Sequence, residues 1–304
     1  MNKRILNIGL ILFLFTYWTN ALLGQNLKPY TIGAINTDDI SSALICVEDN
    51  LKAQDFLILG SYIPAKDPNR RVVVFSSPEL KQAVRQIGGL SGFALAWRIG
   101  ITKEGEAITI SYTTPEYWGN AYFRSDFEKV KSSYSKYSQK LAQALAACGE
   151  NGAKEFGSEK GLSIDKLQDY KYMFGMPKFH STKMLKVFTS YEEAISTIDT
   201  NLEKGILNLK SIYSVELKNQ KLKLYGVGLS GEDGEEQFMP KIDIGVQKHT
   251  AFLPYEFLVM GNEVHMLHGR YRIALSFPDL SMGQFMKIVS TPPSIKRMIE
   301  RVTQ

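Results

Sequence analysis

The sequence predicts an α+β protein with two tandem α/β sandwich domains joined by a helix. Three observations support this class: the chain resembles itself at an offset of roughly 150 residues, each copy alternates strand-like and helix-like stretches, and a long amphipathic stripe lies between the copies. The 304 residues are enough for two domains with separate cores. A composition with 44% hydrophobic and 22% charged residues is typical of folded proteins.

The N-terminus has the three parts of a secretory signal peptide. Two basic residues precede a short apolar run over residues 8–18, and small residues follow that run. We therefore expect residues 1–24 to be a signal peptide of a bacterial protein, cleaved after Ala21 or Gly24, with the mature protein periplasmic or secreted. An uncleaved N-terminal anchor is the alternative. No later stretch reaches ~18 uninterrupted apolar residues, which predicts no membrane span after removal of the signal.

Three blocks of the first copy recur in the same order in the second. At offsets of 151, 158 and 163 residues, their first residues pair as Ala43 with Ala194, Leu95 with Leu253, and Pro115 with Pro278. The second copy therefore carries five more residues between its last two blocks. We interpret the pattern as an ancient duplication, and coincidence between two α/β segments is the alternative.

The first copy has recognisable starts and stops for each element. We expect a strand over residues 30–35, a helix over 38–54, and two strands over 56–63 and 70–77. A second helix over 78–89, a hairpin over 93–114 and a final helix over 115–123 follow. Pro78 suits the first turn of the second helix, and Glu79 is favourable at its positive end.

The amphipathic stripe sets the domain boundaries. Apolar residues at three- and four-residue steps predict a linker helix over residues 126–150, so residues 28–125 form the first domain and residues 181–304 the second. Residues 151–180 have no counterpart in the first copy and are interpreted as an insertion. We expect its aromatic and Met-rich part to pack over the second domain rather than to bind a ligand.

Short motifs of the first copy resemble the DUF302 (TT1751-like) domain family, whose function is unknown. The matching stretches are VVVFSSP at 72–78, ALAWRIGI at 94–101 and ISYTTP at 110–115. Phe75 and Pro78 keep the ends of the Phe-Gly-Asn-Pro turn of that family, while serines replace its Gly and Asn. The resemblance implies a compact α/β fold for each copy and a tendency of the domains to pair side by side. It implies no reaction.

Charge and motifs exclude several function classes. The net charge is +5 with no long block of Lys and Arg, which is not the pattern of a nucleic-acid-binding protein. No G-x-S-x-G nucleophile elbow occurs. Glu116 and Asp279, which follow the paired prolines, are explained by helix starts rather than by a catalytic carboxylate pair. The sequence thus favours a non-enzymatic role, although an enzyme stays open, and it predicts no cofactor.

Aromatic residues are the first candidates for ligand contacts. In the stretch PEYWGNAYF, apolar character persists in the second copy at two of four aromatic positions, which indicates core packing there. Trp118 is matched by Ser281 and is therefore the candidate for a surface contact. We expect the pocket in the cleft between the copies. The residues predicted to bind a ligand are Tyr117, Trp118, Phe75, Pro78 and Tyr255.

The four histidines all lie in the second half, and two of them, His265 and His268, are three residues apart. That spacing places them on one side of a helix but on opposite sides of a strand, and the context favours a strand. Either they decorate an extended hairpin, or their strand is the counterpart of residues 107–112. A metal site at His265 and His268 is the alternative hypothesis, with zinc or, given nearby methionines, copper.

Cys46 and Cys148 are the two cysteines of the chain. Both fall in helical patterns, so buried free thiols are the simpler interpretation, while export would permit a disulfide. The preferred hypothesis for the whole chain is an exported, non-enzymatic binding or assembly module that uses the groove between two domains. Its partner would be a small molecule or an envelope protein, and a homo-oligomer is possible. The alternative is an envelope enzyme or metal-handling protein that uses His265 and His268.

Overall fold

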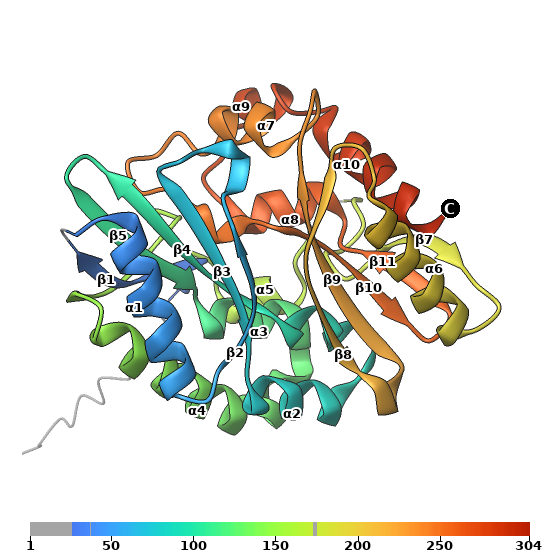
Figure 1. Cartoon of the computed structure of the whole chain (residues 1–304), viewed down its shortest axis with the longest axis horizontal. Helices are drawn as coiled ribbons and strands as arrows, with labels where there is room; N and C mark the ends of the chain where they lie inside the picture. The colour runs from blue at the N-terminus through green and yellow to red at the C-terminus, as the bar shows by residue number, and fades with distance from the viewer. Residues whose placement is uncertain (1–25, 37, 173–174) are drawn as a thin grey trace, which may run out of the picture.

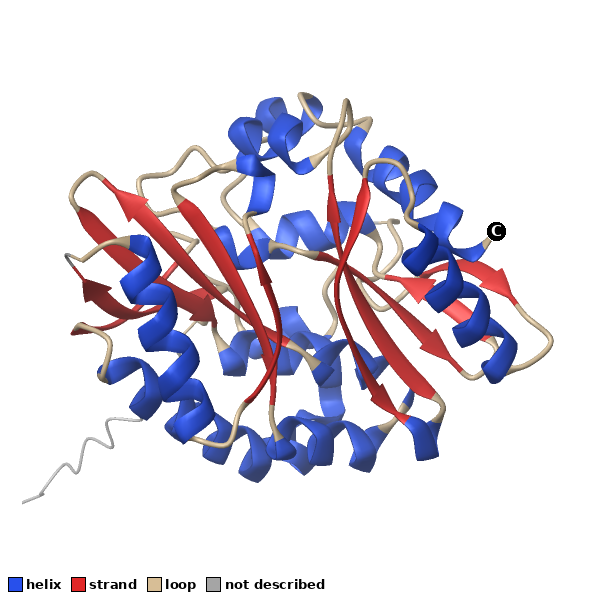
Figure 2. Ribbon diagram, viewed as in Figure 1, coloured by secondary structure: helices blue, strands red, loops and turns tan. Residues whose placement is uncertain are grey.

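The computed structural model describes residues 26–36, 38–172 and 175–304, so the predicted signal peptide, residues 1–24, lies outside the described residues. Helices and two antiparallel sheets confirm the predicted α+β class (Figure 1, Figure 2). Within the described residues, no helix is both long enough and apolar enough to span a membrane.

The first sheet has six strands in the order β2-β3-β4-β5-β1-β6. These strands are β1 (Tyr30–Asn36), β2 (Leu57–Tyr62), β3 (Arg70–Ser76), β4 (Trp97–Glu104), β5 (Ala107–Thr113) and β6 (Glu150–Phe156). The helices of this half are α1 (Ile40–Ala53), α2 (Pro78–Ile87), α3 (Pro115–Phe123), α4 (Phe127–Ala146) and α5 (Ile164–Gln168). As predicted, Pro78 occupies the first turn of α2, where the side chain of Ser77 accepts a hydrogen bond from the Leu80 N–H.

The second sheet has five strands in the order β7-β11-β10-β9-β8. These strands are β7 (Lys183–Val187), β8 (Leu209–Leu217), β9 (Leu222–Leu229), β10 (Tyr255–Met260) and β11 (Glu263–Met266). The helices of this half are α6 (Tyr191–Lys204), α7 (Glu235–Ile242), α8 (Gly269–Ser276), α9 (Met282–Met286) and α10 (Thr291–Glu300).

Apart from β6, the two sheets have the same strand order. The run β2-β3-β4-β5-β1 corresponds to β8-β9-β10-β11-β7. In both halves a helix, α1 or α6, follows the first strand, and another, α3 or α8, follows the hairpin. The same topology therefore occurs twice along the chain.

The segment after the predicted linker helix does not leave the first half at once. It returns as β6, which pairs antiparallel with β1 from Phe156 opposite Tyr30 to Glu150 opposite Ile35. The stretch ENGAKEF has no alternation of apolar residues, so its sequence gave no sign of a strand.

The two halves share a buried interface. Helices α1 and α4 pack on the outer face of the first sheet, and α6 packs on the second (Figure 1). On the inner faces, a short helix of each half reaches the sheet of the other: η2 (Gly89–Leu95) contacts β9 and β10, and η5 (Thr250–Phe252) contacts β3, β4 and β5. The edge strands β2 and β8 are neighbours. One buried apolar cluster includes residues of both halves.

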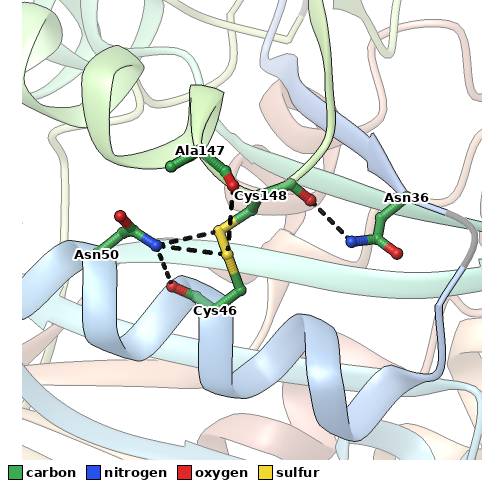
Figure 3. Close-up of a disulfide and its surroundings, with 5 residues drawn as sticks. All are labelled: Asn36, Cys46, Asn50, Ala147 and Cys148. Carbon is green, nitrogen blue, oxygen red and sulfur yellow. Dashed lines mark hydrogen bonds between the residues drawn. A yellow bond between two sulfur atoms is a disulfide. The ribbon is translucent and has the colours of Figure 1, made fainter.

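A disulfide joins Cys46 of α1 to Cys148, just after α4 (Figure 3). The interpretation as free thiols is therefore wrong. The two cysteines lie 102 residues apart in sequence, and their Cα atoms are 5.7 Å apart. The Asn50 side chain donates to the Cys46 carbonyl at 2.9 Å and the Asn36 side chain to the Cys148 carbonyl at 2.8 Å, so a side-chain amide contacts the backbone at each end of the bridge. Helical periodicity placed each cysteine in its segment but gave no information on the distance between segments.

Candidate functional site

A cavity with a volume of about 600 Å³ lies between the two halves. The first half contributes Lys28 and residues 154–158, at the end of β6. The second half contributes residues 242–247, His249 and four residues at or after the end of α8, namely Phe277, Asp279, Leu280 and Gln284. This volume is in the range of small-molecule sites. It fits the predicted position between the copies, but its walls come from β6 and from loops rather than from the predicted aromatic residues.

His249 forms part of the wall of this cavity. Its Nδ1 lies 2.9 Å from the Ser276 carbonyl oxygen, and because a carbonyl only accepts, Nδ1 carries the proton and Nε2 presents a lone pair. The ring stacks on Phe277 with centroids 4.5 Å apart and lies 4.8 Å from the ring of Tyr30. Burial holds the pKa of His249 below its ordinary value, so the imidazole is neutral at pH 7.

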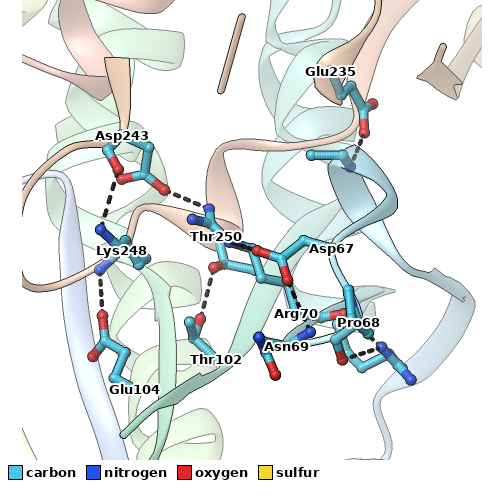
Figure 4. Close-up of polar contacts among 12 residues, drawn as sticks. Asp67, Pro68, Asn69, Arg70, Thr102, Glu104, Glu235, Asp243, Lys248 and Thr250 are labelled. Carbon is cyan, nitrogen blue, oxygen red and sulfur yellow. Dashed lines mark hydrogen bonds and ion pairs between the residues drawn. The ribbon is translucent and has the colours of Figure 1, made fainter. Parts of the chain in front are cut away.

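The loop that carries His249 is tied to the first half by polar contacts (Figure 4). Asp243 accepts a hydrogen bond from the His249 N–H at 3.0 Å and pairs with Arg70 of β3. The Lys248 N–H donates to Glu104 at 3.1 Å. Two threonine hydroxyls, one on β4 and one on η5, lie 2.6 Å apart in the interior. These contacts place His249 although the loop itself has no regular structure.

The middle of the same loop is apolar and exposed. Val246 is 90% exposed and Ile244 is 59% exposed, and both line the cavity. Exposed apolar side chains at the rim of a cavity are typical of a binding surface. The floor is apolar too, since Phe156 and Phe277 are buried and line it.

The lysines and the carboxylates at the rim of the cavity differ in whether they have polar partners. Lys28 and Lys154 have no carboxylate within ion-pair distance in the described part of the chain, whereas Asp279 accepts hydrogen bonds from the Ser158 hydroxyl at 3.0 Å and the Glu159 N–H at 2.6 Å. Glu155 is half-buried and accepts from the Lys28 N–H, and burial raises the pKa of its carboxyl group. The cavity therefore offers apolar walls, one neutral acceptor nitrogen and two lysine amines.

Four of the five residues predicted to bind a ligand are buried in the core. Tyr117, Phe75 and Tyr255 are fully buried, and Trp118 is 3% exposed, so the expectation that Trp118 lies at the surface is wrong. The Trp118 indole N–H donates to the Pro29 carbonyl at 2.9 Å, and the Tyr117 hydroxyl donates to the Leu275 carbonyl at 2.7 Å across the two halves. Pro78 is exposed at the start of α2. None of the five lines the cavity that contains His249.

The structure places His265 and His268 on different elements. His265 lies on β11, which occupies the place of β5 in the second sheet, so the second of the two placements fits. Both ring nitrogens of His265 have partners: Nε2 lies 2.8 Å from Glu263 and Nδ1 lies 3.0 Å from Thr182. His268 precedes α8 and lines another cavity. No group of three or more His, Cys, Asp or Glu residues suited to a metal occurs among the described residues.

The paired prolines do not mark equivalent elements. Pro115 and Glu116 begin α3, as predicted, but Pro278 and Asp279 lie in a turn after α8. The counterpart of α3 by sheet order is α8, which begins at Gly269. Asp279 thus stabilises residues 158–159 rather than a helix start.

A buried ion pair lies at the interface between the halves. Arg98 of β4 and Glu256 of β10 are both almost fully buried, and their charged atoms are 2.7 Å apart. Glu256 also accepts a hydrogen bond from the Tyr213 hydroxyl. Neither residue of the pair lines the cavity that contains His249, so we assign the pair to the interface between the halves rather than to that site.

Comparisons with known proteins give a partial structural likeness. No family model matches it, and no curated protein matches it. The crystal structure of an uncharacterized conserved protein, DUF302, from Bacillus stearothermophilus resembles part of it with a TM-score of 0.34 and 14% sequence identity. That match covers 38% of this chain and 94% of the other. The likeness shows neither membership of that family nor a function.

Proposed function

We propose that the protein is an exported, non-enzymatic binding module whose ligand occupies the cavity around His249. One observation carries the proposal: a cavity of about 600 Å³ receives its walls from both halves and is lined by a neutral histidine whose Nε2 atom has no hydrogen-bond partner among the described residues. The largest cavity with convergent polar groups is the default site for a small molecule.

The chemistry of the walls indicates the class of ligand. The His249 Nε2 atom requires a hydrogen-bond donor, and Lys28 and Lys154 favour a negative group at the rim. The buried phenylalanines and the exposed Ile244 and Val246 favour an apolar body. We therefore propose a small molecule that is partly apolar and carries both a donor and an anionic group.

Binding is a better fit than catalysis for two reasons. The Nδ1 atom of His249 is held by a backbone carbonyl rather than by a carboxylate, and no described Ser, Thr or Cys side chain forms a hydrogen bond with its ring. A nucleophile activated by this histidine would need that contact.

Two further proposals concern the origin and compartment of the chain. We propose that its halves are diverged copies of one DUF302-like domain, supported by the shared strand order of the two sheets. We propose export to the periplasm or the medium, supported by the signal-like N-terminus and by the Cys46–Cys148 disulfide, since disulfides persist in oxidising compartments.

Native mass spectrometry of protein purified gently from its own compartment tests the binding proposal. We expect the wild-type protein to carry a small molecule, and Leu280→Trp, which fills the cavity, to lose it. Leu207→Trp is the matched control, because Leu207 is exposed and does not line this cavity. The proposal fails if folded Leu280→Trp carries the same molecule at the same occupancy as the control.

A further inference from the structure

A second cavity, of about 320 Å³, lies on the second half at the start of α8. One wall is apolar and includes Met176, Met266 and the rings of Pro292 and Pro293 at the start of α10. The other wall includes His268, Gly269, Arg270, Tyr271, Lys183 and Lys296. Its volume is at the lower end of the range of about 300–1,000 Å³ for small-molecule sites.

The polar wall has positive charge that described residues leave unpaired. Lys296 pairs with Glu300, but Lys183 and Arg270 have no carboxylate within ion-pair distance in the parts of the chain that are described. The Gly269 and Arg270 N–H groups at the start of α8 form no hydrogen bond with a described residue, and His268 provides no side-chain cap. The positive end of the helix dipole adds to the same field.

Two uncharged side chains in this wall also lack partners. Tyr271 is fully buried, and its hydroxyl has no hydrogen-bond partner among the described residues. The enclosed Nδ1 of His268 has none either. Buried polar atoms without partners are rare in proteins and require an explanation, such as a bound molecule.

The same field argues against a metal at His268. Burial, followed by the charges of Lys183 and Arg270, lowers the pKa of His268 to about 4. The imidazole is therefore neutral at pH 7, and the two cations that oppose its protonation would equally oppose a metal cation.

We propose that this cavity binds a small amphipathic anion, with its acidic group at Lys183, Arg270 and the start of α8, and its apolar chain against Met176, Met266 and the two prolines. The Tyr271 hydroxyl can donate to the acidic group. The site is separate from the cavity around His249, with which it shares no lining residue.

Octanoate is a suitable probe, with octanol and inorganic phosphate as comparisons. In protein labelled with [methyl-¹³C]methionine, we expect octanoate to shift the Met266 and Met176 methyl signals, assigned from Met266→Leu and Met176→Leu. Octanol should bind at least about tenfold more weakly, because it lacks the charge that the cations recognise. Inorganic phosphate should leave both methyl signals in place. Equal binding of octanol, or an octanoate complex with an unmoved Met266 signal, would overturn the proposal.

Charge variants complete the test. Lys183→Gln/Arg270→Gln should lower octanoate affinity at least about tenfold, whereas Lys160→Gln/Lys166→Gln, which removes the same charge from exposed lysines, should not. Tyr271→Phe should weaken octanoate without loss of stability, since its hydroxyl has no described partner to lose. Unchanged octanoate affinity in the folded Lys183→Gln/Arg270→Gln variant would also overturn the proposal. Leu280→Trp should leave octanoate binding intact, so failure of either site can be recognised separately.

Discussion

At the scale of single residues, the buried carboxylate of Glu235 contacts groups from both halves. It is 1% exposed and accepts hydrogen bonds from the Ala65 N–H at 3.0 Å, the Leu229 N–H at 3.1 Å and the Tyr62 hydroxyl. Ala65 belongs to the connection between β2 and β3 and has a φ of 53°, in the left-handed region. Burial raises the pKa of Glu235 from 4.5 to about 7, because its desolvation cost exceeds the effect of these hydrogen bonds, which lower the pKa.

Because the pKa of Glu235 is raised in the folded protein, the free energy of unfolding falls as the pH rises. The folded protein holds the Glu235 proton more tightly than the unfolded chain, so this contribution is fully present below pH 4.5 and is lost as the pH rises through about 7. The loss amounts to about 3 kcal/mol. We expect Glu235→Gln to flatten the fall in unfolding free energy between pH 5 and pH 8, measured by urea titration. Parallel pH profiles for the wild type and the variant would contradict this assignment.

At the scale of secondary-structure elements, the disulfide connects α1 to the end of α4. Lys140 of α4 contacts Glu79 of α2 at 3.1 Å, so α4 touches both helices that follow early strands of the first sheet. A cross-link that closes a loop of 102 residues restricts the unfolded chain strongly.

Removal of the cross-link should therefore be costly. We expect Cys46→Ser/Cys148→Ser to lower the unfolding free energy by about 4–5 kcal/mol, with the fold retained. Urea titration of the variant and of the oxidised wild type measures the difference, and reduced wild-type protein is the control for the serine substitutions. Two free thiols in the unfolded, unreduced wild type would show that the bridge is absent.

Sequence patterns predicted elements better than they predicted contacts between elements. The first helix was expected over residues 38–54 and spans Ile40–Ala53, and the second was expected over 78–89 and spans Pro78–Ile87. Their signals are local: apolar periodicity, a proline and a cap. The strand β6 was missed because its pairing with β1, more than a hundred residues earlier, determines it rather than its own composition.

The candidate site was missed for the same reason. His249 is one of four histidines in the sequence, and it has a special place only because Lys248 contacts Glu104, 144 residues earlier, and Asp243 contacts Arg70, 173 residues earlier. The prediction of a pocket between the halves rested on a general preference of ligands for such clefts. The sequence points to four aromatic residues instead, and all four pack in the core because a large apolar side chain gains most from burial.

The contacts between the halves are reciprocal at the scale of the whole molecule. At an offset of 158, Gly92 corresponds to Thr250 and Gly100 to Leu258. Gly92 lies against Leu258, and Gly100 lies against Thr250 so closely that a Cβ at Gly100 would be 2.8 Å from the Ala251 nitrogen. Both glycines belong to the first half, at the two places where the second half approaches it closely. Contacts in which i meets j and j meets i are the signature of a two-fold axis, which supports the proposed duplication.

The buried ion pair provides a test of this pseudo-symmetry. Arg98 and Glu256 are related by the same offset of 158, so each occupies the place of the other across the pseudo-two-fold axis. Arg98→Glu alone places two carboxylates together in the interior and should cost about 3–5 kcal/mol. The double variant Arg98→Glu/Glu256→Arg restores the pair with reversed polarity, and we expect it to recover more than half of that loss. Recovery should be incomplete because Tyr213 donates to Glu256 and would then face an arginine.

Urea titrations of the two single variants and the double variant form the complete cycle. If the surroundings of the two positions are equivalent, each charge can be accommodated at the other position. The double variant should then lose less unfolding free energy than the two single variants together. Arg98→Met/Glu256→Met is the control, because it removes both charges and tests whether loss of the pair alone is tolerated. The contrary outcome is a double variant whose loss of unfolding free energy is as large as the sum of the losses of the two single variants, while the methionine control remains stable. The halves would then match in topology but not in their contacts at the axis.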